Sequence, residues 1–189
     1  KASGLSTSYS ISIDPKLTLK SPQQVYLPTH CSYKILVEND LECQYDSLSK
    51  QIITIDHNRG GFIQSNEHEG VAIVIVKFRH QFLTVNIKVS NPRQFYISQA
   101  KSNFDYEFIV LNPDGLQYTT DECLNYELTS FGTDSYDENN KAKRVQSQDG
   151  QIFSIQNIQQ SLDKPVNLLG TVSNQQFRLR NTFYITTSD

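Results

Sequence analysis

The sequence predicts an all-β protein built as two tandem β-sandwiches, and three observations lead to this fold class. Short segments of alternating apolar and polar side chains recur along the chain, with turn residues about every 8 to 12 residues. No stretch of about eleven residues keeps apolar side chains at the helical spacing i, i+3, i+4 and i+7 without a Gly, Pro or turn cluster. The length of 189 residues fits two modules of about 90 to 100 residues each.

The first half of the chain holds most of these strand patterns. Residues 31–37 and 41–45 are separated only by the polar tripeptide Glu38-Asn39-Asp40 and are expected to form a hairpin. Residues 71–76, Val-Ala-Ile-Val-Ile-Val, form the most apolar run, so we expect this strand at the centre of a sheet. The strands expected in the first half are residues 9–13, 24–27, 31–37, 41–45, 52–55, 62–64, 71–78 and 82–89.

The pair Asn91-Pro92 interrupts the alternation, because proline lacks the N–H group that a strand ladder needs. We therefore place one β-sandwich at residues 1–92 and a second at 93–189, with the boundary near residues 90–100 and a short connector that starts at Asn91-Pro92. The second module contains the turn Asn112-Pro113-Asp114-Gly115 and a polar segment, residues 132–150, expected to be a long solvated loop. Its expected strands are residues 104–111, 116–118, 123–131, 151–156, 165–172 and 176–186.

Composition excludes several classes of partner. The formal net charge of -3 leaves no basic surplus to neutralise phosphates, so no nucleic acid is expected as a partner. No apolar run approaches the roughly 20 residues of a membrane helix, so a membrane is expected only through segments outside this chain. The chain contains no Met, even at position 1, which predicts that it is a piece of a longer protein.

The sequence offers no catalytic constellation. A Gly-x-Ser-x-Gly nucleophile elbow and a phosphate-binding glycine loop with its Lys are both absent, so we expect no enzyme, no catalytic residue and no organic cofactor. The four histidines are spaced too widely for a metal-ligand pair and are interpreted as solvated turn residues. They are His30, His57, His68 and His80.

Calcium is the one cofactor for which the sequence offers candidate ligands. Asp134, Asp137 and Glu138 lie in the polar loop, and Asp121 and Glu122 are further acidic candidates. The EF-hand spacing is absent, so a merely hydrated loop is the competing interpretation.

Three cysteines leave the redox state open. Cys31 and Cys43 lie twelve residues apart across the expected hairpin and are the candidate disulfide, whereas Cys123 falls in the other module. Buried free thiols are the alternative interpretation.

Residues 51–76 carry the most informative pattern. A strand ending in Ile55-Asp56 leads through the Gly60-Gly61 turn to Gly70-Val-Ala-Ile-Val-Ile75. This order resembles the bacterial Ig-like group 2 pattern, and the resemblance covers roughly residues 10–90. It implies two tandem Ig-like β-sandwiches and says nothing about an activity.

Two further segments look like the luminal modules of nuclear pore membrane glycoproteins of the gp210 type. They are residues 25–28, Val-Tyr-Leu-Pro, and residues 112–123, which run from the Asn-Pro-Asp-Gly turn to Cys123. This resemblance implies a non-catalytic structural scaffold in the nuclear envelope lumen. Its expected partners are other Ig-like modules of the same chain, in a homo-oligomer or larger assembly formed through sheet edges. An extracellular adhesin-type module and a ciliary scaffold are the alternatives.

Overall fold

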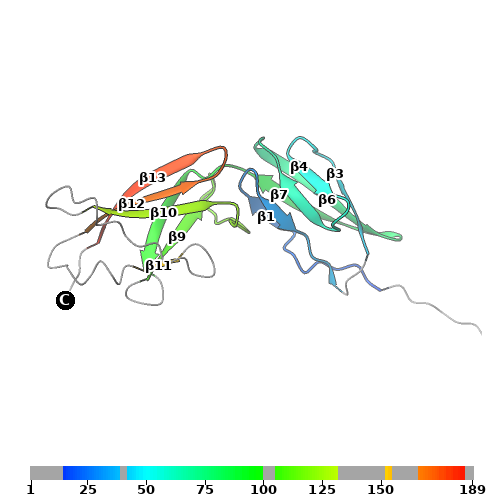
Figure 1. Cartoon of the computed structure of the whole chain (residues 1–189). Helices are drawn as coiled ribbons and strands as arrows, with labels where there is room; N and C mark the ends of the chain where they lie inside the picture. Colours follow the sequence, from blue (N-terminus) through cyan, green and yellow to red (C-terminus); the bar gives the residue numbers. More distant parts are fainter. Residues whose placement is uncertain (1–14, 39–41, 100–104, 132–151, 155–165, 186–189) are drawn as a thin grey trace, which may run out of the picture.

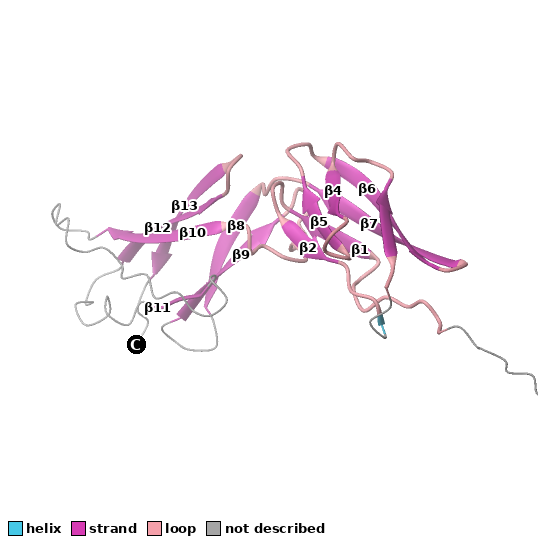
Figure 2. Ribbon diagram, turned by 45° about the vertical axis from the view of Figure 1, so that its right-hand side comes forward, coloured by secondary structure: helices cyan, strands magenta, loops and turns pink. Residues whose placement is uncertain are grey.

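The computed structural model describes residues 15–38, 42–99, 105–131, 152–154 and 166–185 (Figure 1). These residues form strands, turns and loops, with a 3₁₀-helical position at Glu38 and no α-helix, which confirms the all-β fold class (Figure 2). Their buried apolar side chains fall into two clusters, one from Leu17 to Val89 and one from Phe95 to Val172. The module boundary at residue 92 stays a prediction.

The first module consists of two packed sheets. Its strands are β1 (Gln24–Leu27), β2 (Ser32–Lys34), β3 (Gln44–Ser47), β4 (Ile53–Asp56), β5 (Phe62–Ser65), β6 (Gly70–Phe78) and β7 (Gln81–Val89). One sheet has the order β1-β7-β6-β3 and the other has the order β2-β5-β4. The first strand, β1, runs parallel to the last strand, β7, and the other pairs are antiparallel. This division of strands is that of an immunoglobulin-like sandwich.

The core of this module follows from the alternation along its strands. Ala72, Val74 and Val76 on β6 are fully buried between the sheets, and they pair with the equally alternating β7. The strand is an inner one, as its apolar sequence predicts, with β7 on one side and β3 on the other. Its outward face is covered only in part, because Val71 is 58% exposed whereas Ile73 and Ile75 are half-buried.

The turn between β4 and β5 requires a glycine. Gly61 has a φ of +82°, and a Cβ at this position would lie 2.5 Å from the carbonyl oxygen of Ile35. The close approach allows the Ile35 N–H to donate to the Gly61 carbonyl at 2.8 Å. The turn is therefore tied to the segment that follows β2.

The second module repeats the two-sheet division. Its strands are β8 (Gln94–Gln99), β9 (Asp105–Leu111), β10 (Asn125–Phe131), β11 (Ile152–Ser154), β12 (Val166–Ser173) and β13 (Arg178–Ile185). The sheets have the orders β11-β9-β8 and β10-β12-β13. Between them Phe108 stacks on Phe95 and meets the edge of the Tyr126 ring. Gly170 makes room for the rings of Phe95, Phe108 and Phe183, because a Cβ there would lie 3.0 Å from each of them.

Three sequence expectations are wrong. Residues 31–37 and 41–45 do not form a hairpin, because β2 pairs with β5 and β3 pairs with β6 in the opposite sheet. No strand was expected at residues 94–99, where the structure has β8. Residues 116–118 form only an isolated bridge, in which Gln117 pairs with Leu111. The expected strand at 9–13 and the loop at 132–150 lie outside the described residues.

Candidate functional site

The candidate functional site is the junction between the two modules, which lie end to end (Figures 1 and 2). Residues 112–123 of the second module, here called the docking loop, contact the outer edge of β1. The Thr119 N–H donates to the Tyr26 carbonyl at 2.9 Å, and the Tyr26 N–H donates to the Thr119 Oγ1 at 2.9 Å. Thr119 thus occupies the edge of β1 that β7 leaves free.

A disulfide joins the modules at the end of the same loop. Cys31 and Cys123 are bonded, with their Cα atoms 5.2 Å apart, although they are separated by 92 residues. The predicted pair of Cys31 with Cys43 is therefore wrong, and Cys43 is a free thiol. The physical reason is the failed hairpin: Cys31 precedes β2 and Cys43 precedes β3, and these strands belong to opposite sheets.

The docking loop also contacts the end of β7. The Tyr118 hydroxyl donates to the Ser90 carbonyl at 2.8 Å, and the Lys88 ammonium forms an ion pair with the Asp114 carboxylate. Burial raises the pKa of the Tyr118 hydroxyl to about 12. The phenol therefore stays protonated, and remains a donor, across the physiological pH range.

Internal hydrogen bonds hold the docking loop in shape. The buried Asn112 accepts the N–H groups of Asp114 and Leu116 on its Oδ1, at 2.9 and 3.0 Å. Gly115 completes the turn with a φ of +78°. The Asn-Pro-Asp-Gly turn predicted from the sequence is thus present, and it presents Asp114 to Lys88.

A second segment of the second module reaches the first at a separate place. In the turn between β12 and β13, the Asn174 side-chain amide donates to the Thr29 carbonyl at 2.9 Å. The Gln176 side chain donates to the Glu67 carbonyl at 3.0 Å. Thr29 itself is fully buried, and its hydroxyl donates to the Asn91 side chain at 2.6 Å. Two segments of the second module therefore hold the first, which restricts both tilt and rotation.

The base of the docking loop contains a half-buried acid, Asp121. The Tyr126 hydroxyl donates to the Asp121 carboxylate. Burial raises the pKa of the Asp121 carboxyl, while the hydrogen bond from Tyr126 opposes this shift. Burial raises the pKa of the Tyr126 hydroxyl, and the neighbouring Asp121 carboxylate raises it further. Asp121 is thus engaged with the second module's core, and Glu122 is exposed.

We expect the stability of the chain to fall as pH rises from 10 to 12, and Tyr118→Phe to reduce this fall. The folded chain keeps the Tyr118 proton up to about pH 12, whereas the unfolded chain releases it near pH 10. Between these values the folded state binds more protons, so increasing pH favours unfolding. Urea titrations at stepped pH, followed by circular dichroism, measure the slope.

Tyr184→Phe is the matched control for Tyr118→Phe, because Tyr184 is 75% exposed. It should leave the alkaline slope unchanged. A slope that is equal in wild type and Tyr118→Phe would contradict the assignment of a protonated donor at the junction.

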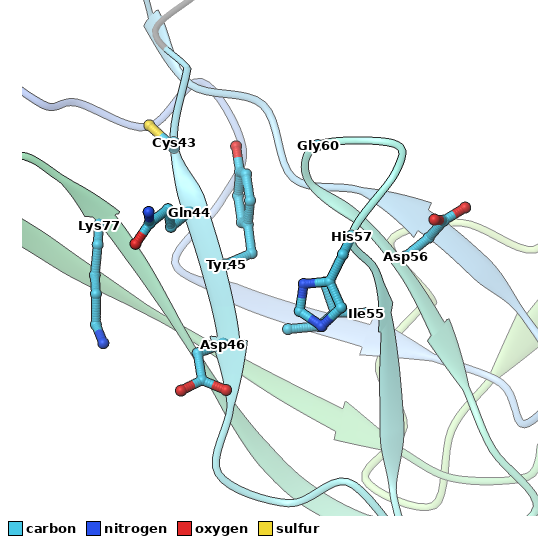
Figure 3. A pocket seen from close by; sticks show the side chains of 9 residues that line it. All are labelled: Cys43, Gln44, Tyr45, Asp46, Ile55, Asp56, His57, Gly60 and Lys77. Atoms are coloured by element: carbon cyan, nitrogen blue, oxygen red, sulfur yellow. The ribbon is translucent and has the colours of Figure 1, made fainter.

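A hollow of about 440 Å³ lies on the first module, between β3 and the turn that joins β4 to β5 (Figure 3). Tyr45 and His57 lie on the side of β3 that faces this turn, and Gln44 and Asp46 project from the other side of the strand, although all four line the hollow (Figure 3). Burial raises the pKa of the Cys43 thiol, which disfavours the thiolate needed for nucleophilic chemistry. The lining residues thus do not form a nucleophile with an activating base.

The other predicted site residues are not brought together. His57, His68 and His80 are exposed and His30 is half-buried, as expected for turn residues. Across the described ranges, no group of three or more His, Cys, Asp or Glu side chains could hold a metal ion. The calcium candidates Asp134, Asp137 and Glu138 lie outside the described residues. Within the part of the chain that is described, no helix is long and apolar enough to span a membrane.

Comparison with known proteins gives likeness to solved structures only. No family model matches the chain, and no curated protein matches it in sequence. Domains 5–6 of the S-layer protein SbsC are 12% identical, over 90% of this chain and 97% of that one, with a TM-score of 0.34. Human protocadherin-24 EC1-2 is 6% identical, over 91% and 96%, with a TM-score of 0.34. Drosophila N-cadherin EC1-3 is 12% identical, over 88% and 64%, with a TM-score of 0.29.

The chain spans about 30% of the longer SbsC structure that comprises domains 4–9, with which it shares 12% identity at a TM-score of 0.36. Scores this low leave the fold to be judged from the strands themselves. The strand orders define the class of protein: tandem Ig-like β-sandwiches joined by a bonded junction.

Sequence reasoning missed the residues that make the junction. Thr29, Thr119 and Asn174 carry no chemical motif, because their role depends on segments far apart in the chain. One signal was present. Residues 25–28 and 112–123, both singled out in the sequence, meet through the hydrogen bonds between Tyr26 and Thr119.

Proposed function

We propose that this chain is a non-catalytic pair of modules from a longer extracellular array of adhesin type, in which it acts as a stiff spacer and binding surface. The junction is the observation that supports this role. Linked domains usually move relative to each other unless their interface is extensive. Here a disulfide, backbone hydrogen bonds at Tyr26 and side-chain hydrogen bonds from Asn174 and Gln176 oppose that motion.

The same disulfide supports an oxidising compartment. Disulfides persist in secreted and luminal proteins and are rare in the cytosol, where thiols are kept reduced. This favours the extracellular assignment and disfavours the ciliary scaffold. Calcium belongs to the proposal as a ligand of the acidic segment that contains Asp134, Asp137 and Glu138.

Small-angle X-ray scattering of the oxidised chain and of a Cys31→Ser/Cys123→Ser variant tests the spacer role. We expect the oxidised chain to give one narrow distance distribution that agrees with the end-to-end arrangement. The variant should give a broader one. An equally broad distribution for the oxidised chain would remove the spacer role.

Measuring thermal stability with and without Ca²⁺ tests the calcium proposal, which requires a higher unfolding midpoint in the presence of the ion.

Mass spectrometry of alkylated protein from its natural source tests the compartment. We expect Cys43 to be alkylated and Cys31 and Cys123 to be protected until reduction. Reduced Cys31 and Cys123 in freshly isolated protein would exclude an oxidising compartment.

A second candidate is a luminal scaffold of the gp210 type in the nuclear envelope. The observation that favours it is the meeting of residues 25–28 with residues 112–123, the two segments that carry the resemblance. The nuclear envelope lumen is also oxidising, so the thiol assay does not separate the candidates. Localisation of the tagged full-length protein does: a signal at the nuclear rim supports the scaffold, and a signal at the cell surface supports the adhesin-type array.

A further inference from the structure

The outward face of the sheet β1-β7-β6-β3 carries an apolar patch that the fold does not use. On β6, the exposed Val71 and the half-buried Ile73 and Ile75 point away from the core, since Ala72, Val74 and Val76 are buried. Leu48 lies beside Ile73, because its N–H donates to the Ile73 carbonyl at 3.1 Å. Leu48 is 64% exposed, and Phe82 on β7 is 71% exposed. Exposed apolar side chains gathered on one sheet face mark an interaction surface.

Two charges flank the centre of this patch. Asp46 is the cross-strand neighbour of Ile75 on β3, and Lys77 follows Ile75 two residues along β6. Asp46 and Lys77 point to the same side of the sheet (Figure 3). Within the described residues neither has an ion-pair partner, and Asp46 accepts only the N–H of the adjacent Ser47.

These positions form a self-complementary arrangement. Asp46 lies beside Ile75 on the neighbouring strand, and Lys77 lies beyond Ile75 along β6. A twofold axis that lies in the interface and passes between these two charges, beside Ile75, brings Asp46 of each copy to Lys77 of the other. Phe82 is the cross-strand neighbour of Lys77, and Leu48 lies two residues beyond Asp46. The same rotation therefore places each Phe82 over the Leu48 of the other copy. A twofold axis repeats every contact, giving two ion pairs and two apolar contacts.

We propose that this face, centred on Ile75 and bounded by Leu48 and Phe82, is a dimerisation surface for a second copy of this chain. It goes beyond the proposed spacer role and does not rest on it. It also differs from assembly through sheet edges: the β1 edge is occupied by Thr119, and the face uses side chains rather than unpaired backbone groups.

Charge reversal gives the sharpest test. Sedimentation equilibrium of the whole oxidised chain, up to about 1 mM, should show a monomer–dimer equilibrium. Asp46→Lys should weaken dimerisation by about tenfold or more, because both ion pairs become repulsive, and Lys77→Asp should do the same. An equimolar mixture of the two variants should restore it, because each ion pair then joins unlike charges again.

Two more variants separate this surface from other causes. Phe82→Ser should weaken dimerisation while leaving the unfolding midpoint of the monomer near the wild-type value, because Phe82 is mostly exposed. Lys20→Asp, an exposed charge reversal outside β1, β3, β6 and β7, should leave dimerisation unchanged. A chain that stays monomeric throughout overturns the proposal. A dimer insensitive to Asp46→Lys and Phe82→Ser also overturns it and indicates edge pairing.

Discussion

Cys123→Ser is expected to lower the free energy of unfolding of the chain by about 4 to 5 kcal/mol, the loop-closure contribution of a crosslink between residues this far apart. The bond spans 92 residues, so its loss releases a large amount of conformational freedom in the unfolded chain. The unfolding midpoint should fall by roughly 10 °C. Differential scanning calorimetry without reductant measures the shift.

Two controls accompany the Cys123→Ser variant. Cys43→Ser should change the midpoint little, because Cys43 is not bonded. Adding a dithiol reductant should lower the wild-type midpoint to that of Cys123→Ser and leave the variant unchanged. A wild-type midpoint that does not respond to complete reduction would contradict a stabilising bond between the modules.

Phe108→Ala is expected to destabilise the second module by about 3 to 5 kcal/mol. Phe108 is 1% exposed, stacks on Phe95 and meets the Tyr126 ring, so truncation leaves a cavity that strands on both sheets cannot fill. Because the two cores are separate, we expect a second, earlier transition rather than a uniform shift. Tyrosine fluorescence and circular dichroism in urea follow it, since the chain contains no Trp.

Phe82→Ala is the matched control for Phe108→Ala, because it makes the same chemical change at a position that is 71% exposed. Measured at low protein concentration, it should stay within about 0.5 kcal/mol of wild type. A loss at Phe82 comparable to that at Phe108 would mean that the outward face of β7 is part of a core.

The strands were predictable where the signal is local. A continuous apolar run marks β6, a short strand pattern marks β7, and the Asn-Pro-Asp-Gly turn depends on residues within one loop. The strand β8 was missed because its apolar residues, Phe95 and Ile97, begin directly after Pro92 and the polar Arg93-Gln94.

The pairing of strands was not predictable in the same way. Residues 31–37 and 41–45 are neighbours in sequence, but each strand satisfies its backbone with a partner in a different sheet. The disulfide error followed from this, because a pair 92 residues apart is reached only through the whole tertiary arrangement. Thr119 and Asn174 are similar cases, since their hydrogen bonds join segments that no short window of sequence connects.

The covalent bond between Cys31 and Cys123 also changes how this chain would respond to mechanical tension applied at its two ends. Force entering along residues before Cys31 crosses directly to Cys123, so everything between them is shielded from the load. If the modules unravelled under tension, about 300 Å of contour length would stay locked until the bond was cleaved. Reduction of the disulfide would thus increase the length to which the chain can be extended under tension.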